Sequence, residues 1–595
     1  MNPSIVKKAA AGLFLLALAL FPLIITNDYY IHMAQMIGIT VIVTQGLNLL
    51  SGYAGQISLG HAGLYAIGAY AAAIVTTNFE MPYLAGLVAS ILCSAVVGLL
   101  IGIPALRVKG HYLAMVTIGV GIIIEKVMNE GGDLTGGFAG ISGIPGPEMF
   151  GFSLTGTGIY YMIVILAAVI TVLLWNLIRT RPGRAFLALR DSETAAEAMG
   201  ISRYRYKLIA FVLSAVITGI GGNMYAHTNN YVSPDSFTSH LSIFLLAMVI
   251  LGGMGTVIGP IIGTILLYLL PEALKNFDDY HLIIYGVILL AFIVGLPGGI
   301  ASLLPKAYRP KETLFNEEKL SKETVGGYEP GVVQGAENNH QAILEIVNLT
   351  KRFSGVVAND RVSMSVERGT IHSLIGPNGS GKTTCLHSIS GLYRYDEGEV
   401  LFEGKSITSL KLHEKVGIGI ARTFQHAQIF KELTVLENVM IGEHNLRKTG
   451  FLGGAMLLPR VVKEEKESQR EALRILDWFG MKELAFAKSG DLPYGYQKIL
   501  EIARAMASRP KLLILDEPAA GLTNTEIEQL EHILIKLRGA GVTILLVEHD
   551  MRLIMKVSNA ITVLDSGRVI AEGSPADIQD NPQVIQAYLG DRKVG

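Results

Sequence analysis

A glycine-rich loop in the second half of the chain has the spacing that holds nucleotide phosphates. The segment IHSLIGPNGSGKTT predicts a buried strand, then a tight loop, then a helix. The glycines let backbone N–H groups surround the phosphates, and the helix adds its positive N-terminal dipole. We expect Lys382 to reach the β- and γ-phosphates and the Thr383 hydroxyl to bind Mg²⁺. The predicted ATP contacts in this segment are Gly376, Pro377, Asn378, Gly379, Ser380, Gly381, Lys382, Thr383 and Thr384.

Two acidic residues follow an apolar segment further along the chain, as hydrolysis of a bound phosphate requires. KLLILDEP predicts a strand ending in Asp516, which is suited to hold Mg²⁺. Glu517 comes next, where it would polarise an attacking water. His549 follows another buried strand, ILLVEHD, and is the second predicted catalytic residue because it would reach the γ-phosphate.

Two more residues complete the predicted nucleotide site. Gln425, in ARTFQHAQIF, lies between these motifs and would sense the γ-phosphate and the metal, so the predicted Mg²⁺ ligands are Thr383, Gln425 and Asp516. Phe353, in LTKRFSG, would stack on the adenine ring. Taken singly, Phe353 also fits a core residue, Gln425 a surface residue and His549 a helix cap. Together these residues predict an ATPase.

The elements that position these residues belong to only one half of the 595-residue chain. About 26 of the 99 Asp, Glu, Lys and Arg residues lie in the first 304 positions, roughly 9%, against roughly 25% in the remainder. The second value is usual for soluble domains. From residue 342 the pattern alternates strands and helices, which predicts an α/β P-loop domain with a helical subdomain. The expected domains are therefore 1–304 in the membrane, a polar linker at 305–341, and 342–595 binding ATP.

The first half predicts an all-α polytopic membrane domain of about ten helices, since a span needs roughly 20 apolar residues. The segment 9–26 is interpreted as an anchoring helix rather than a cleaved signal, because it lacks a clear cleavage site. The eighth and ninth segments are short and glycine-separated, so one broken helix or a re-entrant pair is the alternative. The candidate segments are 9–26, 31–50, 58–77, 83–103, 111–128, 157–178, 207–227, 241–256, 257–271 and 282–302.

The distribution of basic residues predicts how the helices are oriented in the membrane. Basic residues crowd the segment between Arg179 and Lys207, which predicts a cytoplasmic loop and, with an even number of spans, a cytoplasmic ATP-binding half. The net charge of -1 argues against a nucleic-acid binder. Cys93 and Cys385 lie in different halves and form no disulfide framework.

Two groups of polar residues in the first half remain open to interpretation. Those of the early spans would either bond across helices or line a substrate path: Gln45, Asn48, Gln56, Ser58 and His61. The amphipathic stretch around Arg190 would be either a helix parallel to the membrane that meets a soluble partner or a solvated loop.

The ATP-site residues resemble the ATP-binding cassette family over essentially all of 342–595. In that family two cassettes face each other, and each ATP is closed by the partner's LSGGQ loop. The corresponding residues here are Leu492, Pro493, Tyr494, Gly495 and Tyr496. Only Leu492 and Gly495 match, so the loss of the serine hydroxyl removes one expected phosphate contact. The helix that follows can still direct N–H groups at a phosphate.

The membrane half resembles the permeases of branched-chain amino acid importers, most closely the second of the two permeases. The motifs that carry this resemblance are NLLSGYAGQISLGHAGLYAIGAY, ALRVKGHYLAMVTIGVG, GGFAGISGIPGP, LGGMGTVIGP and VGLPGGIA. TAAEAMG resembles the importer coupling motif EAAxxxG, with Thr194 in place of Glu. The resemblance therefore implies a coupling helix containing Arg190, Glu193, Ala195, Ala196, Glu197 and Gly200.

The resemblance implies a permease fused to its ATPase, half of an importer of branched-chain or other hydrophobic amino acids that uses ATP and Mg²⁺. Urea, short amides or other small carboxylates are the alternative substrates. An exporter half-transporter and a non-transporting ATP sensor are the alternative functions. The implied partners are a second permease and a second ATPase, another fused chain included, as a heterodimer or alternatively a homodimer. A periplasmic or surface binding protein would deliver substrate, at the bacterial cytoplasmic membrane.

Overall fold

The computed structural model describes residues 12, 16–106, 111–149, 152–274, 281–303, 327–330 and 342–589. The chain forms two compact units, and each includes one short segment that the sequence places in the other half. Unit 1 comprises Met1–Phe186, Tyr204–Leu314 and Phe451–Leu457. Unit 2 comprises Leu187–Arg203, Phe315–Gly450 and Leu458–Gly595. Of the predicted linker at 305–341, only 327–330 is among the described residues, where Tyr328 is buried against Trp478.

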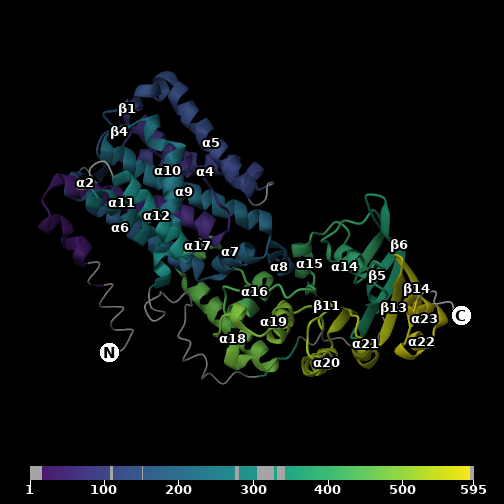
Figure 1. Cartoon of the computed structure of the whole chain (residues 1–595). Helices are drawn as coiled ribbons and strands as arrows, with labels where there is room; N and C mark the ends of the chain where they lie inside the picture. The colour runs from purple at the N-terminus through teal and green to yellow at the C-terminus, as the bar shows by residue number, and fades with distance from the viewer. Residues whose placement is uncertain are drawn as a thin grey trace. The chain divides into compact units, whose positions relative to one another are not determined.

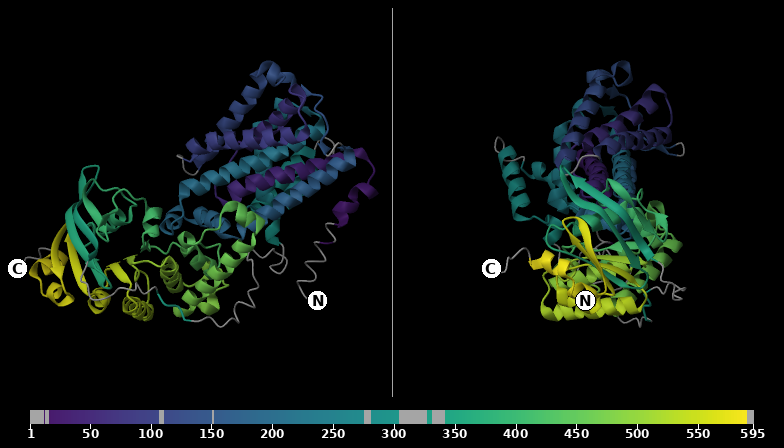
Figure 2. Two further views of the ribbon diagram at one scale, coloured as in Figure 1. Left: turned by 180° about the vertical axis from the view of Figure 1, so that it is seen from behind. Right: turned by 90° about the vertical axis from the view of Figure 1, so that its right-hand side faces the viewer.

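Unit 1 is a helical bundle, seen in the purple to teal ribbons of Figures 1 and 2. Two of its helices continue as π-helical turns, η1 (Asn48–Tyr53) after α2 and η2 (Ile74–Asn78) after α3. Its helices are α2 (Asp28–Leu47), α3 (His61–Ala73), α4 (Tyr83–Ala105), α5 (His111–Glu130), α6 (Gly156–Ile178), α9 (Arg203–Asn229), α10 (Ser239–Gly253), α11 (Gly259–Leu274), α12 (His281–Gly295) and α17 (Phe451–Met456). Two short pairs of strands accompany them: β1 (Ile141–Ser142) with β4 (Tyr231–Val232), and β2 (Glu148–Met149) with β3 (Phe152–Ser153).

The helical membrane architecture is confirmed, while the number of candidate spans among the described residues is lower by length and composition. Six helices of the described residues are long and apolar enough to cross a membrane. The predicted segments 58–77, 257–271 and 282–302 form the shorter helices α3 with η2, α11 and α12. The segment 9–26 lies partly outside the described residues. The predicted segments 241–256 and 257–271 are two helices folded back on each other, since a Cβ on Gly263 of α11 would collide with the carbonyl of Met248 in α10.

The polar residues of the early spans form hydrogen bonds between helices, which is the first of the two alternatives given for them. Gln45 donates to the carbonyl of Val257 at 2.8 Å, and Asn48 to that of Thr256 at 2.9 Å. His61 is fully buried, and its Nε2 lies 2.8 Å from the Ser214 hydroxyl of α9. A buried polar group in an apolar bundle must find such partners. These side chains therefore hold α2, α3, α9 and the α10–α11 connection together.

Unit 2 contains two sheets and the helices around them, drawn from green to yellow in Figure 1. The six-stranded sheet has the order β10-β11-β12-β7-β13-β14, parallel except between β13 and β14. Its strands are β7 (Ile371–Ile375), β10 (Ile420–Arg422), β11 (Leu512–Asp516), β12 (Thr543–Val547), β13 (Ala560–Asp565) and β14 (Arg568–Gly573). The antiparallel sheet β6-β5-β8-β9 contains β5 (Ala342–Phe353), β6 (Val356–Glu367), β8 (Glu397–Phe402) and β9 (Lys405–Ser406).

The parallel strands β7, β11 and β12 are buried along their whole length, as expected for strands covered on both faces. Their carboxyl ends therefore place the phosphate loop, Asp516 and the residues after β12 at one edge of the sheet. The predicted α/β P-loop domain with a helical subdomain is confirmed. Its helices are α14 (Lys382–Ser390), α15 (Leu412–Gly417), α16 (Val435–Gly442), α18 (Pro459–Trp478), α19 (Tyr494–Met506), α20 (Asn524–Gly539), α21 (Met551–Val557), α22 (Pro575–Gln579) and α23 (Pro582–Leu589). Unit 2 also holds α8 (Glu193–Ala198) and the end of α7 (Arg181–Asp191).

Candidate functional site

The phosphate loop joins β7 to α14 and depends on its glycines. Gly376, Gly379 and Gly381 have φ angles of +150°, +82° and +98°. A Cβ on Gly376 would collide with the carbonyl oxygen of Leu564, and one on Gly381 with that of Ala358. Glycine is required there for both conformation and space. The loop is consequently shaped by its own backbone, which is the group that would face the phosphates.

Lys382 begins α14 and turns its ammonium back over the loop. It donates to the carbonyl of Gly376 at 2.8 Å and to that of Pro377 at 2.9 Å. Burial lowers the pKa of Lys382, while the nearby carboxylates of Glu517 and Asp516 act in the opposite direction. The positive charge is thereby kept at the loop, where negative phosphates would be attracted.

Asp516 ends β11 and forms a buried ion pair that we did not predict from the sequence. Arg422, the last residue of β10, donates to Asp516 Oδ2 at 2.9 Å, and both side chains are 2% exposed. Burial raises the pKa of Asp516, and Arg422 opposes this shift. Asp516 Oδ1 is buried without a hydrogen-bond partner among the described residues. This oxygen therefore remains open to a metal ion or to a water bound to one.

The oxygen groups near the loop fit Mg²⁺ better than a transition metal. Among the described residues, no group of three or more His, Cys, Asp or Glu side chains could hold a metal ion. Mg²⁺ is usually held by one or two protein oxygens, with phosphates and waters completing the octahedron. The predicted ligands Thr383, Gln425 and Asp516 offer a hydroxyl, an amide oxygen and a carboxylate, which suits that mode of binding.

Glu517 is held between the two side chains that were predicted to act with it. Gln425 donates its Nε2 to Glu517 Oε2 at 2.8 Å, and His549 Nε2 lies 2.9 Å from Oε1. The backbone of Glu517 has a φ of +47°, which costs about 1 kcal/mol or more for a residue with a side chain. Its N–H donates to the carbonyl of Val547 at 2.8 Å and so fixes this conformation at the ends of β11 and β12. The arrangement can orient the carboxylate toward a water at the loop edge.

Phe353 ends β5 with 40% of its surface exposed, which excludes the alternative of a core residue. Its ring packs edge-on against Tyr393 at 5.4 Å, and Tyr393 packs against His387 of α14 at 4.7 Å. An exposed aromatic face linked in this way to the phosphate-loop helix is placed to stack on a base. The contact between Phe353 and adenine remains a prediction, and this geometry supports it.

The five signature residues lie at the start of α19. Pro493 precedes the helix, Leu492 is buried, and the rings of Tyr494 and Tyr496 are exposed. A Cβ on Gly495 would collide with a carboxylate oxygen of Glu526, so a larger residue here would displace that side chain. No hydrogen bond or ion pair of the described residues joins these five to the phosphate loop. Of the five, Pro493, Tyr494 and Tyr496 are exposed, as contact in trans to a second cassette would need.

Lys498, one turn further along α19, links the signature helix to the backbones of Gln425 and Glu517. Its ammonium donates to the carbonyl of Gln425 at 2.5 Å and to that of Glu517 at 3.4 Å. Burial lowers its pKa. A shift of α19 would therefore reach the backbones that carry Gln425 and Glu517.

The predicted coupling segment is part of unit 2, where α8 packs on α15. Ser192 caps α8 and donates its hydroxyl to Gln428 Oε1 at 2.6 Å. Asp191 accepts a bond from the backbone N–H of Glu432 at 3.4 Å. Gln428 stands three residues after Gln425, so the segment touches the same loop that holds Glu517. The alternative of a merely solvated loop does not fit these contacts.

The residues predicted for the coupling helix divide into a packed face and a charged face. Ala195 and Ala196 are buried, and Gly200, with φ +83°, packs so closely on Asn445 that a Cβ would collide with its amide. Glu193 and Glu197 pair instead with Arg203, at 2.9 and 3.8 Å. Arg190 lies 3.7 Å from Asp191 on the preceding helix.

Four residues of the site were missed in the sequence: Ser192, Arg422, Gln428 and Lys498. Arg422 carried a signal, because it is the single charge in the apolar segment GIGIARTF that leads to Gln425. Ser192 also carried one, since serine before a short helix is a preferred N-cap. Gln428 and Lys498 carried none, because only the tertiary contacts distinguish them from other surface polar residues.

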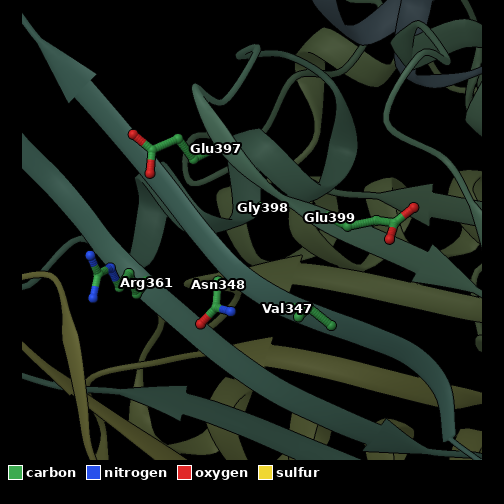
Figure 3. A pocket seen from close by; sticks show the side chains of 6 residues that line it. All are labelled: Val347, Asn348, Arg361, Glu397, Gly398 and Glu399. Carbon is green, nitrogen blue, oxygen red and sulfur yellow. The ribbon is translucent and has the colours of Figure 1, made fainter.

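Figure 3 shows a hollow on the antiparallel sheet. It is lined by Val347, Asn348, Arg361, Glu397, Gly398 and Glu399 of β5, β6 and β8. None of the residues predicted to bind nucleotide is among them, so we assign it no part in ATP chemistry.

Comparison with protein families places a known type of domain in each half. Residues 29–293 match the family described as branched-chain amino acid transport system / permease component. Residues 359–520 match the ABC transporter family, and residues 568–594 match a family described as branched-chain amino acid ATP-binding cassette transporter.

Curated relatives match the second half of the chain. The ATP-binding protein BraF of high-affinity branched-chain amino acid transport in Pseudomonas aeruginosa is 42% identical over 250 residues, 42% of this chain and 98% of the relative. LivG of Escherichia coli K12 is 39% identical over 252 residues, 42% of this chain and 99% of that protein. A probable LivG of Archaeoglobus fulgidus is 43% identical over 248 residues, 42% of this chain and 95% of that protein. A solved nucleotide-free ATP-binding cassette is 35% identical, covering 42% of this chain and all of that one, with a TM-score of 0.38.

Proposed function

The chain belongs to the ATP-binding cassette transporter family and joins a permease domain of the branched-chain amino acid type to its cassette, and we propose that it imports branched-chain amino acids. The observation that carries this proposal is the presence of both matched domains in one chain, with the permease-derived α8 packed in the cassette unit. The chain is thus an ATPase and a membrane protein, and it supplies one permease and one cassette.

In the proposed cycle the phosphate loop and Lys382 bind the phosphates of ATP, and Phe353 stacks on its base. Mg²⁺ would be held by Asp516 Oδ1, Thr383 and Gln425, and would neutralise charge on the phosphates. Glu517, fixed by Gln425 and His549, orients the water that attacks the γ-phosphate. The exposed tyrosines of the signature loop would close the site of a second cassette.

Coupling to the membrane is proposed to run through the loop after Gln425. Ser192 and Asp191 contact Gln428 and Glu432, which lie three and seven residues beyond Gln425. A change in the hydrogen bond between Gln425 and Glu517 would therefore shift the segment on which α8 rests. This is the path by which hydrolysis would move the permease helices.

Six helices of the described residues are long and apolar enough to span a membrane, and an exporter usually has about six long spans. The assignment to import therefore rests on the permease match and on the single coupling segment rather than on the number of helices. We propose that the chain works in the cytoplasmic membrane with a second permease and cassette and with an extracytoplasmic binding protein. Leucine, isoleucine and valine are the proposed substrates, with urea, short amides or other small carboxylates as the alternatives.

The experiment is uptake by sealed vesicles that contain the full chain with its copurifying partners and candidate binding proteins. Labelled leucine, isoleucine, valine, urea and acetamide are offered with ATP on the cassette side. Glu517→Gln is compared with Glu528→Gln, an exposed glutamate of α20. We expect Glu517→Gln to reduce ATP turnover by about 10²- to 10⁴-fold and abolish leucine uptake, while Glu528→Gln retains both.

Each outcome bears on a separate part of the proposal. Normal ATP turnover in Glu517→Gln would contradict the role of Glu517 as the general base. Normal turnover without accumulation of any labelled compound would contradict transport. Accumulation of urea or acetamide, but of no amino acid, would replace the proposed substrate while leaving the transporter assignment intact.

A further inference from the structure

A short helix from the ATP-binding half of the sequence belongs to the membrane unit. Helix α17, with Leu457, is part of unit 1, although Gly450 and Leu458 on either side belong to unit 2 (Figure 1). It packs on α6, where Asn176 donates its side-chain amide to the carbonyl of Ala455 at 3.0 Å. A Cβ on Gly454 would lie 2.6 Å from the Thr180 hydroxyl, so the helix approaches α6 closely.

An aromatic cluster fixes the start of the same helix. The ring of Phe451 lies 5.7 Å from that of Phe186 and 5.3 Å from that of Tyr206, and the latter two are 5.9 Å apart. Such a set of large rings contributes more than its buried area alone. Helix α17 is therefore docked at both ends, by rings at Phe451 and by backbone contact at Gly454 and Ala455.

The contact with α17 lies near the C-terminal end of α6, beyond a row of exposed apolar residues. Ile165, Val169 and Val172 are exposed at spacings of four and three residues, which places them on one face of α6. Asn176 follows Val172 by four residues, so it continues this face about 6 Å further along the axis. Trp175 and Arg179, whose guanidinium lies 5.2 Å from the indole ring, mark the same level. Tryptophan and arginine at the end of an apolar span are typical of the membrane–water interface.

The outer face of α17 is apolar and uncovered. Leu452 is 81% exposed and Met456, one turn later, 65% exposed, and the segment TGFLGGAMLL from Thr449 to Leu458 contains no charge. Exposed basic residues, Lys448 and Arg460, border it on both sides. An apolar helix face flanked by cations, at the end of a lipid-facing helical face, has the character of an interfacial anchor.

We propose that α17 is a membrane-interface anchor, with Leu452 and Met456 inserted among the lipids of the cytoplasmic leaflet beside α6. The occupant of this face is the lipid surface, and the flanking cations favour anionic headgroups. Helix α17 is thus a segment of the cassette half of the sequence that belongs to the membrane unit.

The test places a fluorescent label at the two exposed positions in the full chain. Leu452→Cys and Met456→Cys are made in a Cys93→Ala background, where the buried Cys385 stays unlabelled. The matched control is Ile535→Cys, an exposed apolar residue of α20 in unit 2. Labelled protein is reconstituted into vesicles with 20% phosphatidylglycerol and nitroxide-labelled lipids, and iodide is added as the aqueous quencher. Retained ATP turnover shows that each variant is folded.

We expect nitroxide lipids to quench the labels at 452 and 456 at least threefold more than the label at 535, and iodide to show the reverse order. Equal quenching by iodide at all three positions would overturn the proposal, because α17 would then face water. Protection from both quenchers at 452 and 456 would also overturn it, since a protein would then cover the face. Leu452→Trp and Ile535→Trp, each made in a background of Trp175→Phe and Trp478→Phe, give the same comparison with brominated lipids and no label.

Discussion

The buried pair of Arg422 and Asp516 allows a sharp prediction about the stability of the ATP-binding unit. Arg422→Met keeps most of the side-chain volume and removes the charge. Asp516 would then be left buried at 2% exposure without its counter-charge, in surroundings that already raise its pKa. The Ser390 hydroxyl, which accepts from the same guanidinium at 2.6 Å, would lose its donor as well.

The magnitude follows from breaking a buried pair on one side. Removing one partner of such a pair costs roughly 3–5 kcal/mol, because the remaining charge is uncompensated. A domain of this size loses about 2–4 °C of transition temperature per kcal/mol. The transition of unit 2 should therefore fall by roughly 6–20 °C. Asp516→Asn with Arg422→Met removes both charges and should recover part of that loss.

The assay uses the two tryptophans of the chain. Trp175→Phe leaves Trp478 of α18 as the single reporter, so thermal unfolding followed by its fluorescence reports on unit 2 in the detergent-solubilised full chain. The control is Arg352→Met, which breaks a 2.6 Å pair with Glu397 whose side chains are both more than half exposed. We expect the control to leave the transition unchanged. Equal shifts for Arg422→Met and Arg352→Met, or no recovery in the double variant, would refute the reasoning.

Two further predictions concern the coupling segment and the pH dependence of stability. Gly200→Ala should lower the ratio of leucine uptake to ATP turnover, because the added Cβ collides with Asn445 and the φ of +83° disfavours alanine. Adding Asn445→Ala to this variant should restore the ratio only in part, because the backbone strain remains. An unchanged ratio in Gly200→Ala would contradict the packing. Burial lowers the pKa of His372 to about 4, so its neutral form stabilises the fold above about pH 6.5 and this contribution is lost as the pH falls toward 4. Between pH 6.5 and 5 the loss in the free energy of unfolding is about 2 kcal/mol. The transition temperature reported by Trp478 should therefore fall less over this pH range in His372→Leu than in the parent. Equal falls in the two proteins would exclude His372 as the cause.

The sequence located the candidate ATP-site motifs on the right strands and loops because their parts are short and contiguous. Glycine spacing and a strand ending in two carboxylates describe local geometry, and Gly376, Asp516 and Glu517 lie where those motifs required. Gln425 and His549 could be proposed but not placed, since their contact with Glu517 joins residues 92 and 32 positions apart. The number of spans was harder to predict, because apolar composition does not reveal that a helix such as α11 is short.

The sequence by itself determined that half of this chain meets lipid and half handles nucleotide, because charge density and motif spacing are properties of neighbouring residues. Only the tertiary structure decided that residues 187–203 belong to the ATP-binding unit and residues 451–457 to the membrane unit. It also decided that Arg422 neutralises Asp516. Such contacts depend on burial and shape complementarity between residues far apart in the chain, and no local pattern of residue types encodes them.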